Sequence, residues 1–357
     1  MMTKAPKFRE FISEEKEEPY RLVIISHDDP DDPNETGDLI RSTAKNLGFK
    51  CLLSEFVGAY ISEESNQLFV NSFPVAKGGI VDAPTAKKKA KDYKYDKPFK
   101  INSENTIIMA RGLAISGLSG NHSWSDMIKD LEHRGFTIVN TNECHATCSD
   151  KWMNQIVFER EGIRTPKTVR VTHSEGYEQA LDELDSKFPI ILKTGTGSRG
   201  VGVILVESAA SLQSIIQLLY RENEYIDIIL QEQIKTDYDV RVIIAGDEIM
   251  GAMKRPIPSG DFRSNVSLGS EPVPHKLTEL EKSESLRAAK AVDGIMVGVD
   301  FIPAKNREKD RPYFIEVNST PGLIGIEEAL KSEGSIVEKI LKKLHDRGLW
   351  ANAWQTS

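Results

Sequence analysis

The residue types with the clearest chemical potential lie in the last third of the chain, at the ends of apolar, strand-like runs. Asp300 follows one such run, and Glu316 and Asn318 close the next. Glu316 and Asn318 are two positions apart, so on a strand both side chains point to the same face of a sheet. Mg²⁺ takes hard oxygen ligands, few of them from the protein, and completes its octahedron with phosphate oxygens and water. We therefore expect a site for a nucleotide triphosphate and its metal, rather than charged strand ends that face water.

Basic side chains along the same strands supply positive charge for phosphate oxygens. They are Arg241, Lys254, Arg255 and Arg263, and the amide of Asn265 follows them. A guanidinium can bind a carboxylate through two parallel hydrogen bonds. Arg241 or Arg255 is therefore a candidate for holding a substrate carboxylate.

Residues 193–203 combine a lysine with four glycines, at positions 195, 197, 200 and 202. Glycine lets backbone amides approach an anion closely, and Lys193 at the end of its strand can reach phosphate oxygens. The segment lacks the P-loop spacing GxxxxGK[ST]. It also joins two strands, which argues against a dinucleotide-binding turn. Taken alone, the segment is equally well interpreted as an ordinary glycine-rich hairpin.

Two further segments could complete a nucleotide site. Lys151 lies at the start of an expected helix over residues 149–163, and with Lys193 it could clamp a triphosphate from one side. Glu232 and Gln233 follow an apolar strand, where a linker between subdomains offers backbone N–H and C=O groups to the edge of an adenine. By themselves these two residues indicate only a polar linker.

Length and composition limit the fold and the partners. At 357 residues the chain is too long for one simple core, so two or three subdomains are expected. Hydrophobic residues make up 39% and charged residues 28%, no apolar run is long enough to span a bilayer, and the N-terminus does not resemble a signal peptide. Three cysteines argue against a disulfide framework and favour a reducing, cytoplasmic location. A net charge of −8 makes nucleic acid an unfavourable partner.

The hydrophobic pattern predicts alternating strands and helices. Residues 21–60 read as strand, helix and strand, with Gly48 ending the helix, which is a βαβ opening. Buried strands are expected at 104–112 and 136–140, on either side of a helix at 122–135. In the second half, the expected helices cover 149–163 (capped by Ser149 or Asp150), 173–186, 211–223, 277–294 and 332–348.

Four segments outside this pattern allow more than one interpretation. Residues 144–148 (CHATC) lack a fourth ligand at zinc-like spacing, so a small turn with partly buried thiols is expected. The acidic loop 27–33 could favour a basic acceptor or simply be solvated. The lysine-rich insertion 86–100 could dock an acidic protein, but an exposed charged loop is the better interpretation. Trp350 and Trp354 could pack on the body or on a second subunit.

In their order along the chain, these motifs resemble the ATP-grasp superfamily, and specifically the RimK-type ligases, which add amino acids such as glutamate to a carboxyl group. GDFRSN and EVNSTPGLIGIE are close to that family's own strings. The likeness covers roughly residues 20–345 and is strongest from 148 to 330. The motifs that carry it are Asp150–Lys151, Lys193 with its glycines, Gln231–Glu232, Asp239–Arg241, Gly260–Asn265, Gly298–Asp300 and Glu316–Gly322.

The resemblance implies an ATP-grasp fold of mixed α/β and α+β class. Its parts would be an N-terminal Rossmann-like pre-ATP-grasp domain, a small lid subdomain and a C-terminal α+β subdomain, with ATP between the last two. The implied boundaries are a flexible arm at 1–19, the pre-ATP-grasp domain at 20–148, the lid at 149–234, the C-terminal subdomain at 235–345 and a tail at 346–357.

Site residues follow from the resemblance position by position. Asp300, Glu316 and Asn318 would hold two Mg²⁺ or Mn²⁺ ions, with Glu316 bridging them. Glu232 and Gln233 would contact the adenine and Asp239 the ribose, although the family often has an apolar or aromatic residue where Gln233 stands. The nucleotide-binding set is Lys151, Lys193, Gly197, Ser198, Gly200, Gly202, Glu232, Gln233, Asp239, Arg241, Arg263, Ser264 and Asn265. The catalytic residues would be Lys193, Arg263 and Asn265. A lengthened turn at 304–312 and the insertion at 86–100 depart from the family pattern and leave the acceptor open.

The implied activity is ATP- and Mg²⁺-dependent ligation of a carboxylate to an amine through an acyl phosphate. The favoured substrates are glutamate or another amino acid and the C-terminal carboxylate of a peptide or protein. Alternatives are a ligase that makes a small peptide-like metabolite or modifies a cofactor, and a non-catalytic ATP-binding module. A nucleic-acid binder that uses the lysine-rich loop is a weaker alternative. We expect a homo-oligomer and no membrane association.

Overall fold

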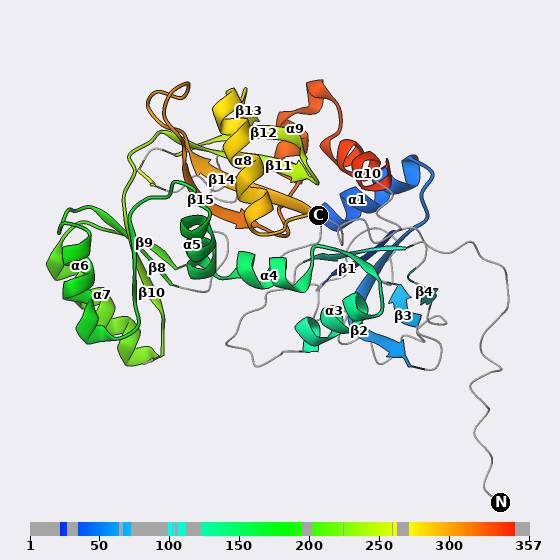
Figure 1. Cartoon of the computed structure of the whole chain (residues 1–357), viewed down its shortest axis with the longest axis horizontal. Coiled ribbons are helices and arrows are strands. Elements are labelled where there is room, and N and C mark those ends of the chain that lie inside the picture. Colours follow the sequence, from blue (N-terminus) through cyan, green and yellow to red (C-terminus); the bar gives the residue numbers. More distant parts are fainter. Residues whose placement is uncertain are drawn as a thin grey trace, which may run out of the picture. The chain divides into compact units, whose positions relative to one another are not determined.

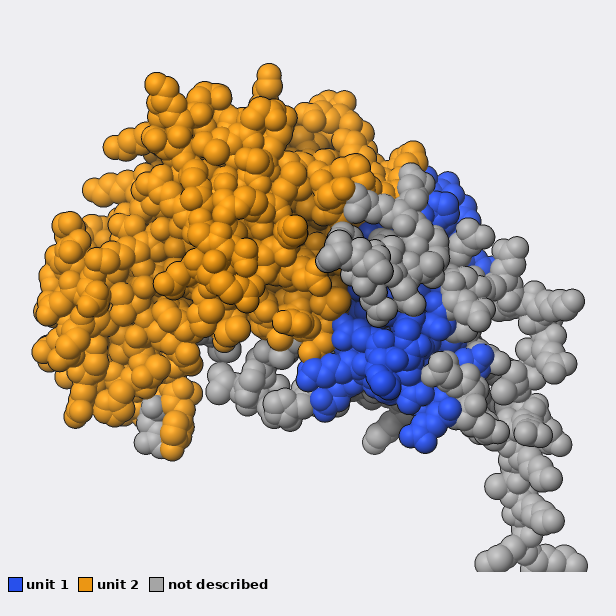
Figure 2. Space-filling model, in the orientation of Figure 1, with its two compact units in different colours: residues 1–113, 123–139, 344–357 blue, residues 114–122, 140–343 orange. Residues whose placement is uncertain are grey.

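A computed structural model of the chain describes residues 22–26, 35–63, 67–72, 99–101, 103, 106–111, 123–194, 202–223, 225–258, 260–262 and 271–346. The chain divides into two compact units (Figure 2). Unit 1 comprises residues 1–113, 123–139 and 344–357, and unit 2 comprises residues 114–122 and 140–343.

Unit 1 is built on a six-stranded sheet with the strand order β4-β3-β2-β1-β5-β6. Its centre is parallel, because β1 pairs in parallel with β2 and β5, and β5 with β6. Helix α1 (Glu35–Asn46) connects β1 to β2, which confirms the expected βαβ opening. The strands are β1 (Leu22–Ser26), β2 (Cys51–Ser62), β3 (Gln67–Ser72), β4 (Phe99–Ile101), β5 (Ile107–Arg111) and β6 (Thr137–Val139).

The core of unit 1 lies between this sheet and helix α3 (Ser123–His133). Ile128 and Leu131 of α3 pack with strand residues such as Val23 and Ile108, and all four are at most 3% exposed. Continuous burial along β5 explains why its sequence is apolar throughout rather than alternating, since a central parallel strand is covered on both faces. The predicted strand–helix–strand order over 104–140 is confirmed.

Unit 2 contains a four-stranded antiparallel sheet with the order β7-β10-β8-β9. Helices α6 (Tyr177–Glu183) and α7 (Ala209–Glu222) both pack on one face of it, against the alternating residues Ile190, Leu192, Ile228 and Leu230 (Figure 1). The strands are β7 (Thr168–Val171), β8 (Ile190–Thr194), β9 (Val203–Val206) and β10 (Ile228–Glu232). The helix expected over 173–186 is shorter than predicted, because residues 174–176 form a 3₁₀ turn before α6 begins.

The second sheet of unit 2 has five strands in the order β13-β12-β11-β14-β15, all antiparallel. One face packs on α5 (Lys151–Arg160) and α8 (Glu279–Ala291), around Val242, Val299 and Phe301. The strands are β11 (Tyr238–Ala245), β12 (Glu248–Pro256), β13 (Val273–Pro274), β14 (Met296–Ile302) and β15 (Tyr313–Asn318). Because side chains alternate along a strand, the residues between these core positions must point to the opposite face.

Close packing of the C-terminal segment on this sheet depends on two strand glycines. A Cβ on Gly298 would lie 2.8 Å from Cβ of Pro321, and one on Gly251 would lie 2.5 Å from a Leu330 methyl group. Glycine is therefore required where the backbone of one element approaches another. Two helices follow, α9 (Ile324–Ala329) and α10 (Ile336–Asp346), and α10 confirms the last predicted helix.

The segment 144–148, predicted to be a small turn, is instead part of helix α4 (Asn142–Ser149). Thr141 caps this helix, and its hydroxyl accepts from the Cys144 amide at 3.2 Å. The apolar pattern of α4 is too weak to reveal a helix, which is why the prediction was wrong. Asp150 both ends α4 and caps α5, as predicted, by accepting from the Trp152 and Met153 amides at 2.7 and 3.2 Å.

The lengthened turn at 304–312 is anchored to the start of α8. Thr278 and Glu281 form a capping box there, and Arg307 binds both oxygens of the Glu281 carboxylate at 2.7 Å. Glu281 is 1% exposed and its pKa falls to about 2, since the hydrogen bonds from Arg307, His275 and Thr278 outweigh the cost of burial. The turn therefore belongs to the packed structure of unit 2.

Candidate functional site

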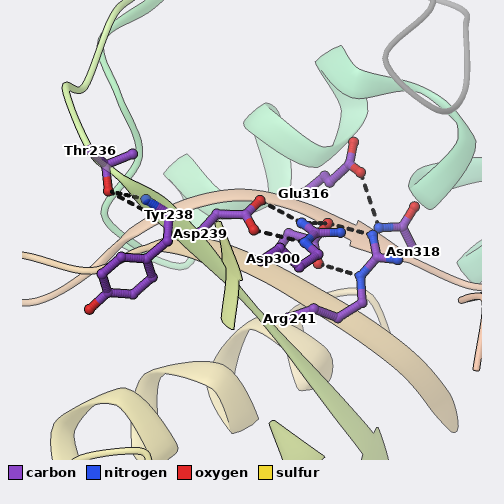
Figure 3. A network of polar contacts seen from close by, with 8 residues as sticks. Thr236, Tyr238, Asp239, Arg241, Asp300, Glu316 and Asn318 are labelled. Atoms are coloured by element: carbon purple, nitrogen blue, oxygen red, sulfur yellow. Dashed lines mark hydrogen bonds and ion pairs between the residues drawn. The ribbon is translucent and has the colours of Figure 1, made fainter. Parts of the chain in front are cut away.

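The face of the five-stranded sheet that points away from α5 and α8 carries a row of charged side chains (Figure 3). Arg241 of β11 lies directly opposite Asp300 of β14, and Asp300 lies directly opposite Glu316 of β15. Asn318, two residues after Glu316, and Asp239, two residues before Arg241, share this face. The register therefore brings the predicted metal ligands together, although Asp300 and Glu316 are 16 positions apart in the chain.

Two arginines bind the carboxylates of this row through paired hydrogen bonds. Arg241 donates to Asp300 from Nε to Oδ1 at 2.7 Å and from Nη2 to Oδ2 at 2.6 Å. Arg255 of β12 donates to Asp239 from Nε and Nη2 at 2.7 and 2.5 Å, and from Nη2 to Asp300 Oδ2 at 3.0 Å. Two guanidiniums and two carboxylates thus balance in charge within one network. We call these four residues the fork network.

Burial makes the fork network strong and constrained. The side chains of Arg255 and Asp300 are 3% and 4% exposed, whereas that of Arg241 is 17% exposed. Burial raises the pKa of Asp300, but Arg241 and Arg255 outweigh it and hold that pKa below its usual value. Burial likewise opposes the charge on Arg255, but Asp300 and Asp239 raise its pKa overall. Asp300 is therefore a carboxylate in a fixed orientation.

The donor set fits a hard divalent cation. Asp300 and Glu316 contribute carboxylate oxygens from facing positions on β14 and β15, and Asn318 contributes an amide. The Asn318 Nδ2 atom donates to Glu316 Oε1 at 3.1 Å, so the amide oxygen is the Asn318 atom with acceptor capacity for a cation. Within the described residues no cluster of three or more His, Cys, Asp and Glu side chains could hold a metal. Such a site therefore depends on the amide and on phosphate oxygens.

Two lysines bring positive charge close to Glu316. Lys193 is the next-to-last residue of β8, on the face of the four-stranded sheet opposite α6 and α7, and Lys151 is the first residue of α5. Burial lowers the pKa of Lys193 to about 8, against the opposing effect of Glu316, and nearby Lys151 lowers it further. Burial also lowers the pKa of Lys151, against the raising effects of Glu316 and Asp150. The two lysines and Glu316 therefore form one electrostatic cluster.

The hairpin between β8 and β9 is tied at its base. The Thr194 amide donates to the carbonyl oxygen of Gly202 at 3.0 Å. Gly202 has a φ of +76°, and a Cβ there would lie 2.4 Å from the Thr194 hydroxyl, so only glycine fits. The rest of the glycine loop, with Gly197, Ser198 and Gly200, lies outside the described residues. So do Arg263, Ser264 and Asn265.

Glu232 and Gln233 lie where the four-stranded sheet leads into the five-stranded sheet. Glu232 pairs with Lys167, whose amide donates to Glu232 Oε1 at 2.8 Å while the Glu232 amide donates to the Lys167 carbonyl at 2.9 Å. The Glu232 side chain thus fixes the linker backbone. The predicted adenine contact stays a prediction for the backbone of these residues.

Asn154 of α5 is a positioning residue that sequence reasoning missed. Its Oδ1 accepts from the Val317 amide at 2.9 Å, and its Nδ2 donates to the carbonyl oxygens of Thr147 and Asp150 at 2.9 and 3.2 Å. Val317 lies between Glu316 and Asn318, so Asn154 joins β15, which carries these two predicted metal ligands, to the start of α5. A signal was present in the sequence, because Asn154 interrupts the buried stripe that Val157 and Phe158 continue.

Asn140 and His145 support the segment after β15 and were also missed. The Asn140 side chain accepts from the amides of Ile295 and Met296 and donates to the carbonyl oxygens of Met296 and Ser319. His145 Nδ1 and the Ser319 hydroxyl form a hydrogen bond of 2.9 Å. Both side chains are buried, at 0% and 2% exposure, and they fix the residue that follows Asn318.

The fold and this site define an ATP-grasp ligase, an enzyme of the ADP-forming carbon–nitrogen ligase class. The family model described as "RimK-like ATP-grasp domain" matches residues 148–344, more than half of the chain. The chain therefore belongs to the RimK-like ATP-grasp family. The predicted family and fold are confirmed, and ligases of this class use ATP and Mg²⁺.

Individual relatives agree with this assignment. A Xanthomonas oryzae protein named "Probable alpha-L-glutamate ligase" is 34% identical over 213 residues, which are 59% of this chain and 70% of that protein. The D-Ala:D-Ser ligase VanG from Enterococcus faecalis has a similar fold, with a TM-score of 0.63 at 17% identity over 94% of this chain and all of that one. The ATP-grasp ligase PsnB, solved with a precursor variant, Mg and ADP, has a TM-score of 0.62 at 16% identity over 91% of this chain and 98% of that one. The part of the chain that the structure describes contains no helix long and apolar enough to cross a membrane.

Proposed function

We propose that the protein joins an amino acid, with glutamate as the first candidate, to the carboxyl group of a peptide or protein. ATP would convert that carboxyl group to an acyl phosphate, which the amine attacks with loss of phosphate. The observation that carries the proposal is the row of Arg241, Asp300 and Glu316 on one sheet face, with Lys193 and Lys151 close to Glu316.

The chain's own residues would act by positioning and by balancing charge. Lys193 and Lys151 would bind phosphate oxygens as ammonium groups, and Arg263, Ser264 and Asn265 of the GDFRSN segment would act on the transferred phosphoryl group. Asp300, Glu316 and Asn318 would hold Mg²⁺, which would supply positive charge to neutralise the phosphate oxygens. Glu232 and Gln233 present backbone groups to the adenine, and Asp239 lies on the ribose side.

We assign the glycine-rich hairpin a role in excluding water from the site. An acyl phosphate hydrolyses readily, so the reaction needs a cover over the site while the amine attacks. Gly197, Ser198, Gly200 and Gly202 would form that cover above the phosphates, with the Thr194–Gly202 hydrogen bond as its base. No covalent attachment to the protein is required.

The choice of substrates rests on the relatives. Several curated relatives that are 32–34% identical are named as probable alpha-L-glutamate ligases, and PsnB has been solved with a minimal precursor and with a precursor peptide. We therefore place an amino acid on the amine side and a peptide carboxylate on the acceptor side. The same proposal includes the pre-ATP-grasp domain, the lid and the C-terminal subdomain, with the boundaries given above. It also includes a cytoplasmic location and a homo-oligomer.

The test is ADP release with ATP and Mg²⁺ across the twenty amino acids, with and without a pool of peptides and cell extract, followed by mass spectrometry of the acceptors. Turnover that depends on glutamate, with a matching mass added to a peptide, is the expected result. A mass added to a small metabolite would instead identify a metabolite ligase. Binding of ATP without turnover in any mixture would contradict the proposal and favour a non-catalytic ATP-binding module.

A further inference from the structure

Arg255 contacts two carboxylates that the proposed function assigns to different ends of the nucleotide. Its Nε and Nη2 atoms bind Asp239, on the ribose side, and its Nη2 atom also reaches Asp300, on the metal side. Asp239 and Asp300 lie on neighbouring strands, and Arg255 comes from a third strand. One guanidinium therefore links the ribose-side carboxylate of Asp239 to the metal-side carboxylate of Asp300.

The contacts of Arg255 leave it poorly suited to hold a substrate. Its side chain is 3% exposed, and the two nitrogens that form its fork are already bonded to protein carboxylates. Arg241 lies on the same face but is 17% exposed, so it is the arginine of this pair that substrate or phosphate can reach. Arg241 therefore stays the candidate for holding a substrate carboxylate, and Arg255 has a different role.

The orientation of Asp300 depends on both arginines. Arg241 contacts both oxygens of Asp300 from one side, whereas Arg255 contacts Oδ2 alone and is itself anchored by two bonds to Asp239. A carboxylate has about four acceptor sites on its two oxygens, so three arginine contacts leave capacity for a cation in a restricted direction. If Arg241 turns toward a phosphate, Arg255 alone keeps Asp300 in place.

We propose that Arg255 is a positioning residue that couples the ribose-side carboxylate Asp239 to the metal ligand Asp300, and thereby sets how much Mg²⁺ the enzyme needs to bind its nucleotide. The inference rests on the proposed function, since it takes Asp300 as a metal ligand. The planar fork of arginine makes this coupling possible. Lysine carries the same charge as a single point donor and cannot hold both carboxylates in one geometry.

The experiment measures binding of the ATP analogue AMPPNP by calorimetry over a series of Mg²⁺ concentrations, in the full chain and in Arg255→Lys. We expect the Mg²⁺ concentration at half-saturation to rise about tenfold or more in the variant, while AMPPNP affinity at saturating Mg²⁺ changes about threefold or less. The Michaelis constant for the amino acid should stay unchanged. The charge is the same in both proteins, so the shift reports the loss of the fork.

Arg307→Lys is the matched control. Arg307 also forks a buried carboxylate of unit 2, that of Glu281, and none of the hydrogen bonds and ion pairs described for its side chain reaches the fork network. We expect its Mg²⁺ requirement to stay within about twofold of wild type. An equal rise in the Mg²⁺ requirement of both variants would mean that loss of any bidentate arginine–carboxylate contact in unit 2 has this effect. That result would overturn the proposal.

A second variant covers the case in which Arg255→Lys does not fold. Asp239→Asn loosens the anchor of Arg255 without touching Asp300, and it should raise the Mg²⁺ requirement in the same direction. Where both variants fold, the double variant should add little to either change alone, as expected for residues that act as one unit.

Three outcomes would contradict the inference. The Mg²⁺ requirement could stay unchanged while the Michaelis constant for amino acid or acceptor rises, which would make Arg255 a substrate-binding residue. It could fall, which would make Arg255 a competitor of the cation. If wild type itself binds AMPPNP with no dependence on Mg²⁺, the proposed function fails together with the inference, whereas a Mg²⁺-dependent wild type with an unshifted variant removes the inference alone.

Discussion

The two sheets of unit 2 differ in whether their buried charges are balanced by neighbouring side chains. The five-stranded sheet holds two arginines and two aspartates that neutralise one another in the fork network, which raises the pKa of Arg255 and lowers that of Asp300. The four-stranded sheet holds Lys193, whose pKa falls to about 8 because burial outweighs the attraction of Glu316. A balanced network is rigid before any ligand arrives, whereas the cost of burying the Lys193 ammonium is fully offset only once a polyanion is bound.

The difference suggests a division of labour within the site. On the proposed function, the balanced sheet would fix the direction of the metal ligands, and the unbalanced sheet would supply affinity for phosphate. Substitutions in the two sheets should therefore separate stability from ligand binding.

Asp300→Asn should produce the largest loss. It removes a proposed cation ligand, and it leaves Arg241 and Arg255 with one carboxylate between them. We expect ADP production to fall at least about 1,000-fold, which corresponds to ~4 kcal/mol in the barrier. Removing one partner of a buried ion pair should also lower the free energy of unfolding by about 3 kcal/mol. ADP release and urea unfolding measure the two effects. Full stability with lost activity would show that the fork network does not stabilise the fold.

Lys193→Met should show the opposite pattern. The substitution replaces a buried ammonium, which is costly in the free protein, with an apolar chain of similar length. We expect ATP affinity to fall about 10- to 100-fold, in keeping with ~1.5–3 kcal/mol for a charge-assisted hydrogen bond, while thermal stability stays equal or rises. Calorimetry with ATP and thermal unfolding check the two halves. A stability loss as large as that of Asp300→Asn would refute the contrast between the sheets.

Asn154→Ala should have an intermediate effect on both properties. The substitution leaves the buried Val317 amide without its acceptor, which costs about 1–3 kcal/mol of unfolding free energy. It also loosens the strand between Glu316 and Asn318, so we expect ADP release to fall about tenfold through misplacement of these ligands. Urea unfolding and ADP assays provide the measurements.

Gln155→Ala is the control for Asn154→Ala, because Gln155 is the next residue of α5 and bonds only to the Thr165 hydroxyl among the contacts described. Gln155→Ala should change both the free energy of unfolding and ADP release only slightly. Equal effects from the two variants would mean that Asn154 supports the helix alone and does not position β15.

Sequence reasoning predicted the elements better than the contacts between them. Strands such as β5 and β14, and helices such as α7 and α8, follow from apolar periodicity and caps, which are local properties. Helix α4 escaped prediction because its apolar pattern is weak and its start depends on the Thr141 cap. The nearness of Asp300 and Glu316 could be expected from the resemblance to a family, but their direct pairing depends on the β14–β15 register.

The fork network itself could not be predicted from the residue types. Arg255 was identified as a basic residue near the site, but its binding to Asp239 and Asp300 depends on the registers of β12, β11 and β14 together. The roles of Asn154 and Asn140 likewise depend on backbone groups more than 150 residues away. Long-range register and packing are properties of the assembled fold, and no local pattern encodes them.

The smallest predicted effect is a pH dependence that comes from Lys193. Its pKa is about 8 in the free protein, lowered by burial against the attraction of Glu316, so the ammonium form predominates below pH 8 and is lost progressively above it. Phosphate oxygens bind the ammonium form, so ATP binding takes up a proton above pH 8. We expect ATP affinity to change little below about pH 7 and to fall about fivefold between pH 8 and pH 9, approaching tenfold or ~1.4 kcal/mol per pH unit above that.

The stability of the free protein should respond to pH with the opposite sign. The unfolded lysine keeps its ordinary pKa of 10.5, so the cost of burying the ammonium is present below pH 8 and disappears as pH rises toward 10.5. Lys193→Arg supplies the control, because arginine stays charged throughout this range and should flatten the loss of ATP affinity. An undiminished loss in that variant would assign the pH dependence to another group, such as Lys151, whose pKa burial also lowers. The lysine would then contribute a fixed charge, and the contrast between the two sheets would rest on the fork network alone.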